Sequence, residues 1–106
     1  MNLIIGKTNQ DVVNRFHVPI EWLGDKSVHL FIASSMWDTL YVDVTDDIPC
    51  DVLKYVVTRC RDIKVVLPED LTEHSVELLC ELYPDKSGSI RKAYTFKRSV
   101  ADVLYS

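Results

Sequence analysis

Cysteine is the side chain of this sequence with the strongest nucleophilic chemistry, and Cys50 is the best placed of the three cysteines. It follows Pro49, a residue typical of the first turn of a helix, and a helix N-terminus favours a thiolate. Three nearby aspartates oppose this effect, because negative charge disfavours an anionic sulfur. Cys60 and Cys80 fall on apolar helical positions, where a thiol packs as a small hydrophobe. A small enzyme that uses Cys50 is therefore kept only as an alternative.

Aspartate supplies the densest group of possible metal ligands, at Asp43, Asp46, Asp47 and Asp51. Carboxylates near a strand end can hold Mg²⁺ or Ca²⁺. The run lacks the spacing and the glycine of a calcium-binding loop. We favour a strand-to-helix loop in which Asp47 caps the next helix. A metal-dependent enzyme built on this acidic cluster is the second form of the enzyme alternative.

Gly6-Lys7-Thr8 stands between an apolar run and a helical pattern, which is where a phosphate loop ends. A P-loop needs an earlier glycine five positions before Gly6, and Met1 occupies that position. We predict a strand-ending glycine and a helix-capping threonine instead. The histidines also lack metal-binding spacing; they are His17, His29 and His74. The sequence therefore predicts no bound metal and no cofactor.

Three glutamates recur every fourth residue, at Glu73, Glu77 and Glu81. Like charges at this spacing destabilise a helix, so local helix stability does not explain them. A basic neighbour would offset the repulsion, and the basic C-terminal segment is the nearest one in sequence. A solvated face or an acidic docking surface, including mimicry of a nucleic-acid backbone, would also explain the pattern.

The C-terminal segment 86–106 carries five basic side chains and one acidic one, whereas the rest of the chain carries seven and fifteen. Its bases alternate with aromatics over 90–98; the side chains concerned are Arg91, Lys92, Tyr94, Phe96, Lys97 and Arg98. This composition is typical of a strand that binds RNA or single-stranded DNA. The glycines of the aromatic RNA-binding pattern are missing. The cations would also protect a sheet edge from aggregation.

Met36 and Trp37 lie in a short connection between two apolar segments. Methionine and aromatic side chains are enriched at protein interfaces, and a loop can present them to a partner. Trp37 can instead fold back over the end of the sheet. Trp22 allows the same two interpretations.

Hydrophobic spacing predicts the elements that position these groups. Strands are expected at 3–5, 28–33, 40–45, 63–67 and, with helix as the competing interpretation, 90–96. Helices are expected at about 8–16, 49–61, 70–83 and 99–105, with a single turn after Pro19. Residues 85–89 read as a flexible turn before the basic segment.

The element order predicts an α/β fold, with α+β as the competing class, in one compact domain over 1–106. The short connection between 28–33 and 40–45 favours an antiparallel pair, because parallel strands need a longer crossover. We therefore expect a mixed sheet of four to five strands with a central antiparallel hairpin, packed by three to four helices.

Composition sets the broad class of the protein. Apolar residues make up 47% and charged residues 26% of the 106 residues, an ordinary globular balance. Three widely spaced cysteines do not suit a disulfide scaffold, which favours a reducing, cytoplasmic location. No apolar run is long enough to span a membrane, and the N-terminus does not resemble a signal peptide.

These patterns favour a small, non-enzymatic module that regulates or inhibits a partner protein through charged faces and an aromatic anchor. Trp37, with Met36, is the expected anchor, and either the glutamate face or the basic segment 90–98 orients the encounter. A homodimer is a further expectation, since an edge strand near the C-terminus and complementary charged surfaces suit self-association. A nucleic-acid-binding module that uses 90–98 is the first alternative, and a small enzyme is the second.

Overall fold

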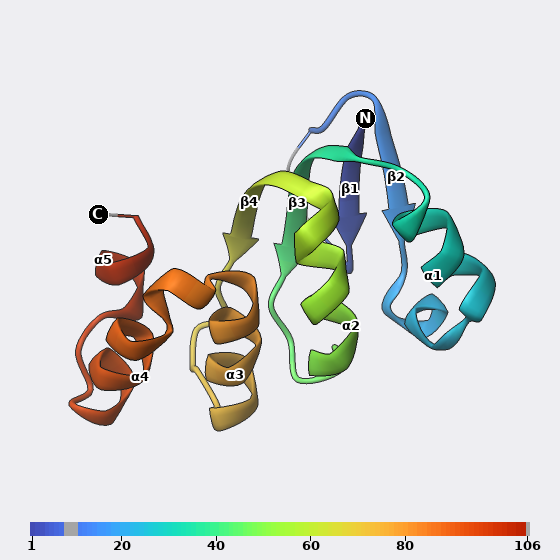
Figure 1. Ribbon diagram of the computed structural model, residues 1–106. Helices are drawn as coiled ribbons and strands as arrows, with labels where there is room; N and C mark the ends of the chain where they lie inside the picture. Colours follow the sequence, from blue (N-terminus) through green and yellow to red (C-terminus); the bar gives the residue numbers. More distant parts are fainter. Residues whose placement is uncertain (8–10, 106) are drawn as a thin grey trace.

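Four strands and five α-helices make up the described part of the computed structural model, which covers residues 1–7 and 11–105 (Figure 1). The strands are β1 Asn2–Ile5, β2 Arg15–Val18, β3 Trp37–Asp43 and β4 Cys60–Val66. The α-helices are α1 Lys26–Ala33, α2 Cys50–Val56, α3 Glu73–Leu82, α4 Ser87–Thr95 and α5 Val100–Leu104. Short 3₁₀ helices span Ile20–Gly24, Val57–Arg59 and Pro84–Lys86.

The four strands form one sheet in the order β2-β1-β3-β4, and every pairing is parallel. The predicted mixed sheet with a central antiparallel hairpin is therefore wrong. Residues 28–33, expected as one strand of that hairpin, belong to α1. This helix connects β2 to β3, and a helical crossover is what a parallel pairing requires.

Asp25 caps the N-terminus of helix α1. The Asp25 carboxylate accepts a hydrogen bond from the Ser27 backbone N–H at 2.8 Å, which satisfies one of the free donors of the first turn. The alternation in 28–33 did not distinguish strand from helix, because nearly every residue there is apolar. Val28 and Ile32, four residues apart, are the side chains that pack into the core.

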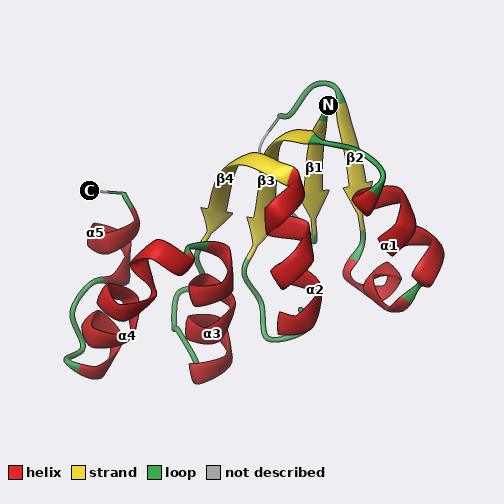
Figure 2. Cartoon of the chain, viewed as in Figure 1, coloured by secondary structure: helices red, strands yellow, loops and turns green. Residues whose placement is uncertain are grey.

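Two further elements differ from the expectation. Residues 15–18 form β2, where the helix predicted from Thr8 was to end; Thr8 itself lies outside the described residues. Arg15-Phe16-His17-Val18 alternates polar and apolar side chains, the strand pattern over only four residues. Residues 90–96, expected as a strand, belong mainly to α4 (Figure 2). The flexible turn expected at 85–89 is helical as well.

Other predictions are confirmed. The helix expected at 49–61 is present but shorter, as α2 Cys50–Val56 followed by one 3₁₀ turn. The strand expected at 63–67 is β4, which begins earlier, so Cys60 lies in a strand and not on the predicted helix. Helix α3 ends before Pro84, as the proline predicts. Its cap is Thr72, whose side chain accepts a hydrogen bond from the Ser75 N–H at 3.1 Å. Gly6 ends β1 with φ +80°, the left-handed conformation that glycine allows.

One face of the sheet carries the main core. Leu3 and Ile5 of β1 share a buried cluster with Leu40 of β3 and with Leu53 and Leu79 of helices α2 and α3. The opposite face is partly open to solvent: Lys64 is exposed there, with its ammonium 5.9 Å from the centre of the Tyr41 ring. Helix α3 lies beside α2, and helices α4 and α5 extend beyond β4, at the end of the molecule opposite α1 (Figure 1).

The outer edge of β4 is covered by tyrosine hydroxyls. Tyr83 donates a hydrogen bond to the Ile63 carbonyl at 3.2 Å, and Tyr105 donates one to the Val65 carbonyl at 2.8 Å. An edge strand with free carbonyls invites pairing with another chain. The two tyrosines thus protect this edge and attach the C-terminal helices to the sheet. The C-terminal edge strand expected at 90–96, one of two grounds for the expected homodimer, is replaced by α4.

Tyr83→Phe and Tyr105→Phe should each lower the free energy of unfolding by about 1 kcal/mol, because each removes one hydrogen bond to a strand carbonyl. Burial raises the pKa of Tyr83 to about 12, whereas a phenol in the unfolded chain titrates near pH 10. The stabilisation is therefore complete below pH 10 and is lost as the pH rises through 12. Urea unfolding between pH 8 and 12 should show a smaller alkaline loss for Tyr83→Phe than for the unchanged chain.

Candidate functional site

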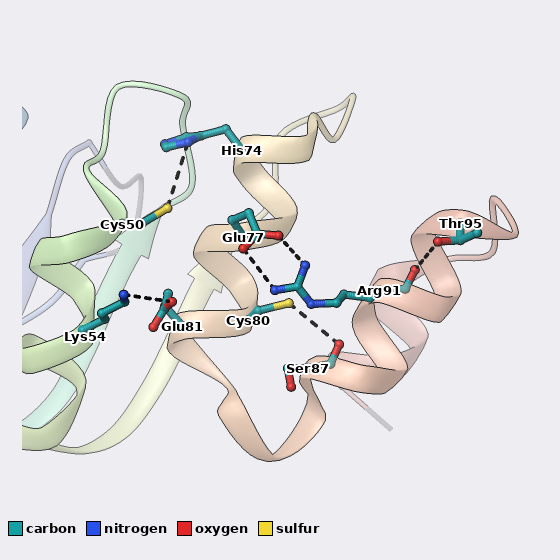
Figure 3. A network of polar contacts seen from close by, with 9 residues as sticks. All are labelled: Cys50, Lys54, His74, Glu77, Cys80, Glu81, Ser87, Arg91 and Thr95. Atoms are coloured by element: carbon teal, nitrogen blue, oxygen red, sulfur yellow. Dashed lines mark hydrogen bonds and ion pairs between the residues drawn. The ribbon is translucent and has the colours of Figure 1, made fainter.

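The acidic face of α3 meets the basic helix α4 inside one molecule. Glu77 accepts two hydrogen bonds from the Arg91 guanidinium: one from Nη1 to Oε1, and one from Nη2 to Oε2 at 3.0 Å (Figure 3). The Arg91 guanidinium holds the pKa of Glu77 below its usual range. Arg91 and Glu77 therefore act in the fold, where they set the position of α4 against α3.

The other two glutamates of the acidic face differ in their surroundings. Glu81 lies 4.0 Å from the Lys54 ammonium of α2 (Figure 3), so the repulsion along α3 is partly compensated from a second side. Glu73 is exposed in the first turn of α3, where the helix dipole favours a carboxylate. The acidic face is thus largely explained by contacts within the chain.

Basic and aromatic side chains gather where α4 ends, at a surface that we call the α4 tip, formed by Lys92, Phe96, Lys97 and Arg98. All four are exposed, and 65% of Phe96 is accessible to solvent. The Arg98 guanidinium lies 6.0 Å from the centre of the Phe96 ring, within the range of a cation–π contact. Tyr94, expected in the same surface, is half-buried.

The backbone at the α4 tip forms a Schellman motif. The Arg98 N–H donates to the Ala93 carbonyl at 2.7 Å, and the Lys97 N–H donates to the Tyr94 carbonyl at 3.1 Å. Lys97 occupies the left-handed position of this motif with φ +55°. Glycine is the usual residue there, because a side chain raises the energy of this conformation by about 1–2 kcal/mol. The α4 tip thus keeps a lysine where local stability favours glycine.

Trp37 does not serve as the expected exposed anchor. Its side chain is 1% exposed, and its Nε1–H donates to the Ile32 carbonyl at 3.1 Å. The ring packs beside Phe16 and Phe31. Met36 is exposed beside it, so the two residues do not form one exposed pair. The structure corresponds to the other interpretation, in which the indole covers the end of the sheet.

Cys50 has a histidine neighbour that its sequence neighbourhood does not reveal. The Cys50 Sγ lies 4.0 Å from Nδ1 of His74 (Figure 3). Nε2 of His74 lies 2.7 Å from the Ile48 carbonyl. A carbonyl only accepts hydrogen bonds, so Nε2 of His74 donates this one. Burial, with the Glu81 carboxylate as the next contribution, raises the pKa of Cys50. A raised pKa favours the protonated thiol, which is the weaker nucleophile.

The aspartates of the acidic cluster have different surroundings. Asp46 accepts hydrogen bonds from Thr72 at 2.5 Å and from Ser75 at 3.3 Å, so it supports the start of α3. Asp43 and Asp47 line a crevice of about 480 Å³ that also includes Lys7. Asp47 does not cap α2, whose N-cap is Pro49. Over residues 1–7 and 11–105, no three histidine, cysteine or acidic side chains are brought together in a way that could hold a metal ion.

That crevice lies where β1 and β3 end, next to Gly6. In open parallel sheets this is the point at which connections run to opposite sides and where ligands often bind. Partial burial raises the pKa of Asp43. Gly6 and Lys7 are the lining residues that the phosphate-loop interpretation shares with this crevice; the carboxylates that also line it do not suit a phosphate.

In comparisons with known proteins, the chain matches no family model, no curated protein and no solved structure. None of the helices in the described part of the chain combines the length and the apolar character that crossing a membrane requires. A function is therefore inferred from the residues and their geometry alone.

Proposed function

We propose that this protein is a non-enzymatic, cytoplasmic interaction module that regulates or inhibits a partner protein by binding an acidic surface of it. The observation that carries this proposal is the α4 tip: an exposed phenyl ring with Lys97 held in a left-handed conformation and Arg98 beside it. Aromatic and arginine side chains dominate the energy of protein interfaces. Phe96 takes the role of anchor that the sequence suggested for Trp37.

The division of charge supports an acidic partner. Arg91 is paired with Glu77, so Lys92, Lys97 and Arg98 are the cations that α4 and its C-terminal turn present outward. Complementary charge steers a partner to such a surface and sets its orientation. The Glu77–Arg91 contact holds α4 against α3, and Tyr83 and Tyr105 attach the chain before and after α4 to β4. A helix held in this way loses less entropy on binding.

Nucleic acid is the second candidate ligand, because an exposed ring beside an arginine can also stack on a base. The strand on which this alternative depended is a helix, so a row of stacking rings is not formed. The acidic remainder of the chain, with fifteen carboxylates against seven bases, would also repel a phosphate backbone.

Capture from an extract of the source cells, followed by binding with the purified partner, tests the proposal. We expect one protein that resists nuclease, whose affinity falls as salt rises. Phe96→Ser should weaken binding by about tenfold or more, as loss of an interface anchor does. Leu30→Ser is the matched control, because Leu30 is a 72% exposed apolar side chain on α1.

Two results would contradict the proposal. Loss of capture on nuclease treatment would favour nucleic acid, and equal weakening by Phe96→Ser and Leu30→Ser would remove the α4 tip from the interface. If the captured protein is a second copy of this chain, the acidic partner is the chain itself. Light scattering of the purified chain checks this result.

A further inference from the structure

A hollow of about 620 Å³ lies between α4 and α5, next to the α4 tip. Its polar lining residues are Lys86, Ser89, Lys92, Arg98, Ser99 and Asp102. Three cations against one carboxylate leave this lining with an excess of two positive charges. The two serines add hydroxyl groups that can donate hydrogen bonds.

Contacts within the chain hold one of these cations in place. The Lys86 ammonium donates to the Val103 carbonyl at 3.2 Å and to the Leu104 carbonyl at 3.1 Å. These contacts attach Lys86, which precedes α4, to the end of α5. An ammonium has three N–H donors, so two contacts leave Lys86 a further donor for a ligand in the hollow.

The turn after α4 positions the second cation. Arg98 follows the left-handed Lys97, and its backbone N–H is bonded to the Ala93 carbonyl at 2.7 Å. The backbone of Arg98 is therefore fixed where α4 ends, and Arg98 and Ser99 both line the hollow. The guanidinium presents paired donors that match two oxygens of one anion.

We propose that this hollow binds the phosphate monoester of a phosphorylated segment in the partner protein. The inference rests on the proposed function and names the acidic group that the partner presents. A phosphomonoester carries about −1.5 to −2 charges and three acceptor oxygens, which matches the excess charge and the hydroxyl donors. A carboxylate offers one charge. A nucleic-acid backbone offers singly charged phosphates in a row, whereas this is a single hollow.

Titration of the full chain with O-phosphoserine, followed by NMR at fixed ionic strength, tests the site. We expect saturable shifts at Ser89, Lys92 and Ser99, and no saturation with glutamate. Asp102→Asn should tighten binding by about threefold or more, because it removes the one carboxylate from the lining. Arg98→Gln should weaken it by about tenfold. Lys64→Gln, an exposed lysine on β4, should leave it unchanged.

Unsaturable shifts, or no tightening in Asp102→Asn, would overturn the inference. Phosphatase treatment of the partner distinguishes failure of the phosphate site from failure of the proposed function. If dephosphorylation leaves Phe96-dependent capture intact, the proposed function stands and the phosphate site is wrong; if capture never depends on Phe96, the proposed function fails as well. Inorganic phosphate that binds as tightly as O-phosphoserine, with capture insensitive to phosphatase, would assign the hollow to free phosphate and overturn the partner assignment.

Discussion

Lys97→Gly should make the fold more stable and the protein a poorer binder. Lys97 has φ +55° at the left-handed position of the Schellman motif, where a side chain costs about 1–2 kcal/mol. Glycine removes that strain, and the greater freedom that it gives the unfolded chain offsets part of the gain. We expect the free energy of unfolding to rise by about 0.5–1 kcal/mol, as measured by urea denaturation.

Affinity should change in the opposite direction. The substitution removes one of the exposed cations of the α4 tip, so binding to the acidic partner should weaken by about threefold to tenfold and depend less on salt. Lys64→Gln is the control, because it removes an exposed lysine charge and keeps a side chain that a strand tolerates. Lys64→Gly is not suitable, because glycine destabilises a strand. A more stable Lys97→Gly variant with undiminished affinity would show that the lysine is not kept for binding.

Trp37→Ala should cause the largest loss of stability, about 3–5 kcal/mol, through the cavity left by a fully buried indole. The side chain is 1% exposed, packs beside Phe16 and Phe31, and bonds to the Ile32 carbonyl. A domain of this size has about 5–15 kcal/mol in total, so the variant should be partly unfolded near 37 °C. Thermal unfolding followed by circular dichroism measures this loss.

Trp37→Phe separates stability from binding. It keeps a ring in the core and should cost less than Trp37→Ala, while affinity for the partner stays unchanged below the melting transition. Reduced affinity in a fully folded Trp37→Phe protein would mean that Trp37 takes part in the interface after all, and that the partner opens the end of the sheet to reach it.

Local signals in the sequence were sufficient for several elements. Pro49 and Pro84 delimit helices close to where the sequence places them, and Gly6 ends the first strand. These residues act through their own backbone, so their effect does not depend on the rest of the fold. The α4 helix was open to both interpretations, since Ile90 and Tyr94 satisfy helical spacing as well as the parity of a strand.

Contacts between distant residues decided what the sequence left open. Arg91 pairs with Glu77 only because α4 lies against α3. That packing favours a helix over a strand for residues 90–96. His74 reaches Cys50 from another helix, 24 positions away. The wrong prediction of an antiparallel hairpin came from segment 28–33, which forms α1 and not a strand. The left-handed backbone of Lys97 could not be predicted from the sequence, because a lysine gives no indication of that conformation.

Photo-crosslinking from position 96 tests the central claim most directly. A photoreactive phenylalanine analogue at Phe96, introduced into the full chain in its source cells, should form an adduct with a single protein at an acidic segment. The same analogue at Leu30 should form no such adduct. Adducts to nucleic acid, or the same set of proteins from both positions, would contradict the assignment of the α4 tip as the surface that binds a partner protein.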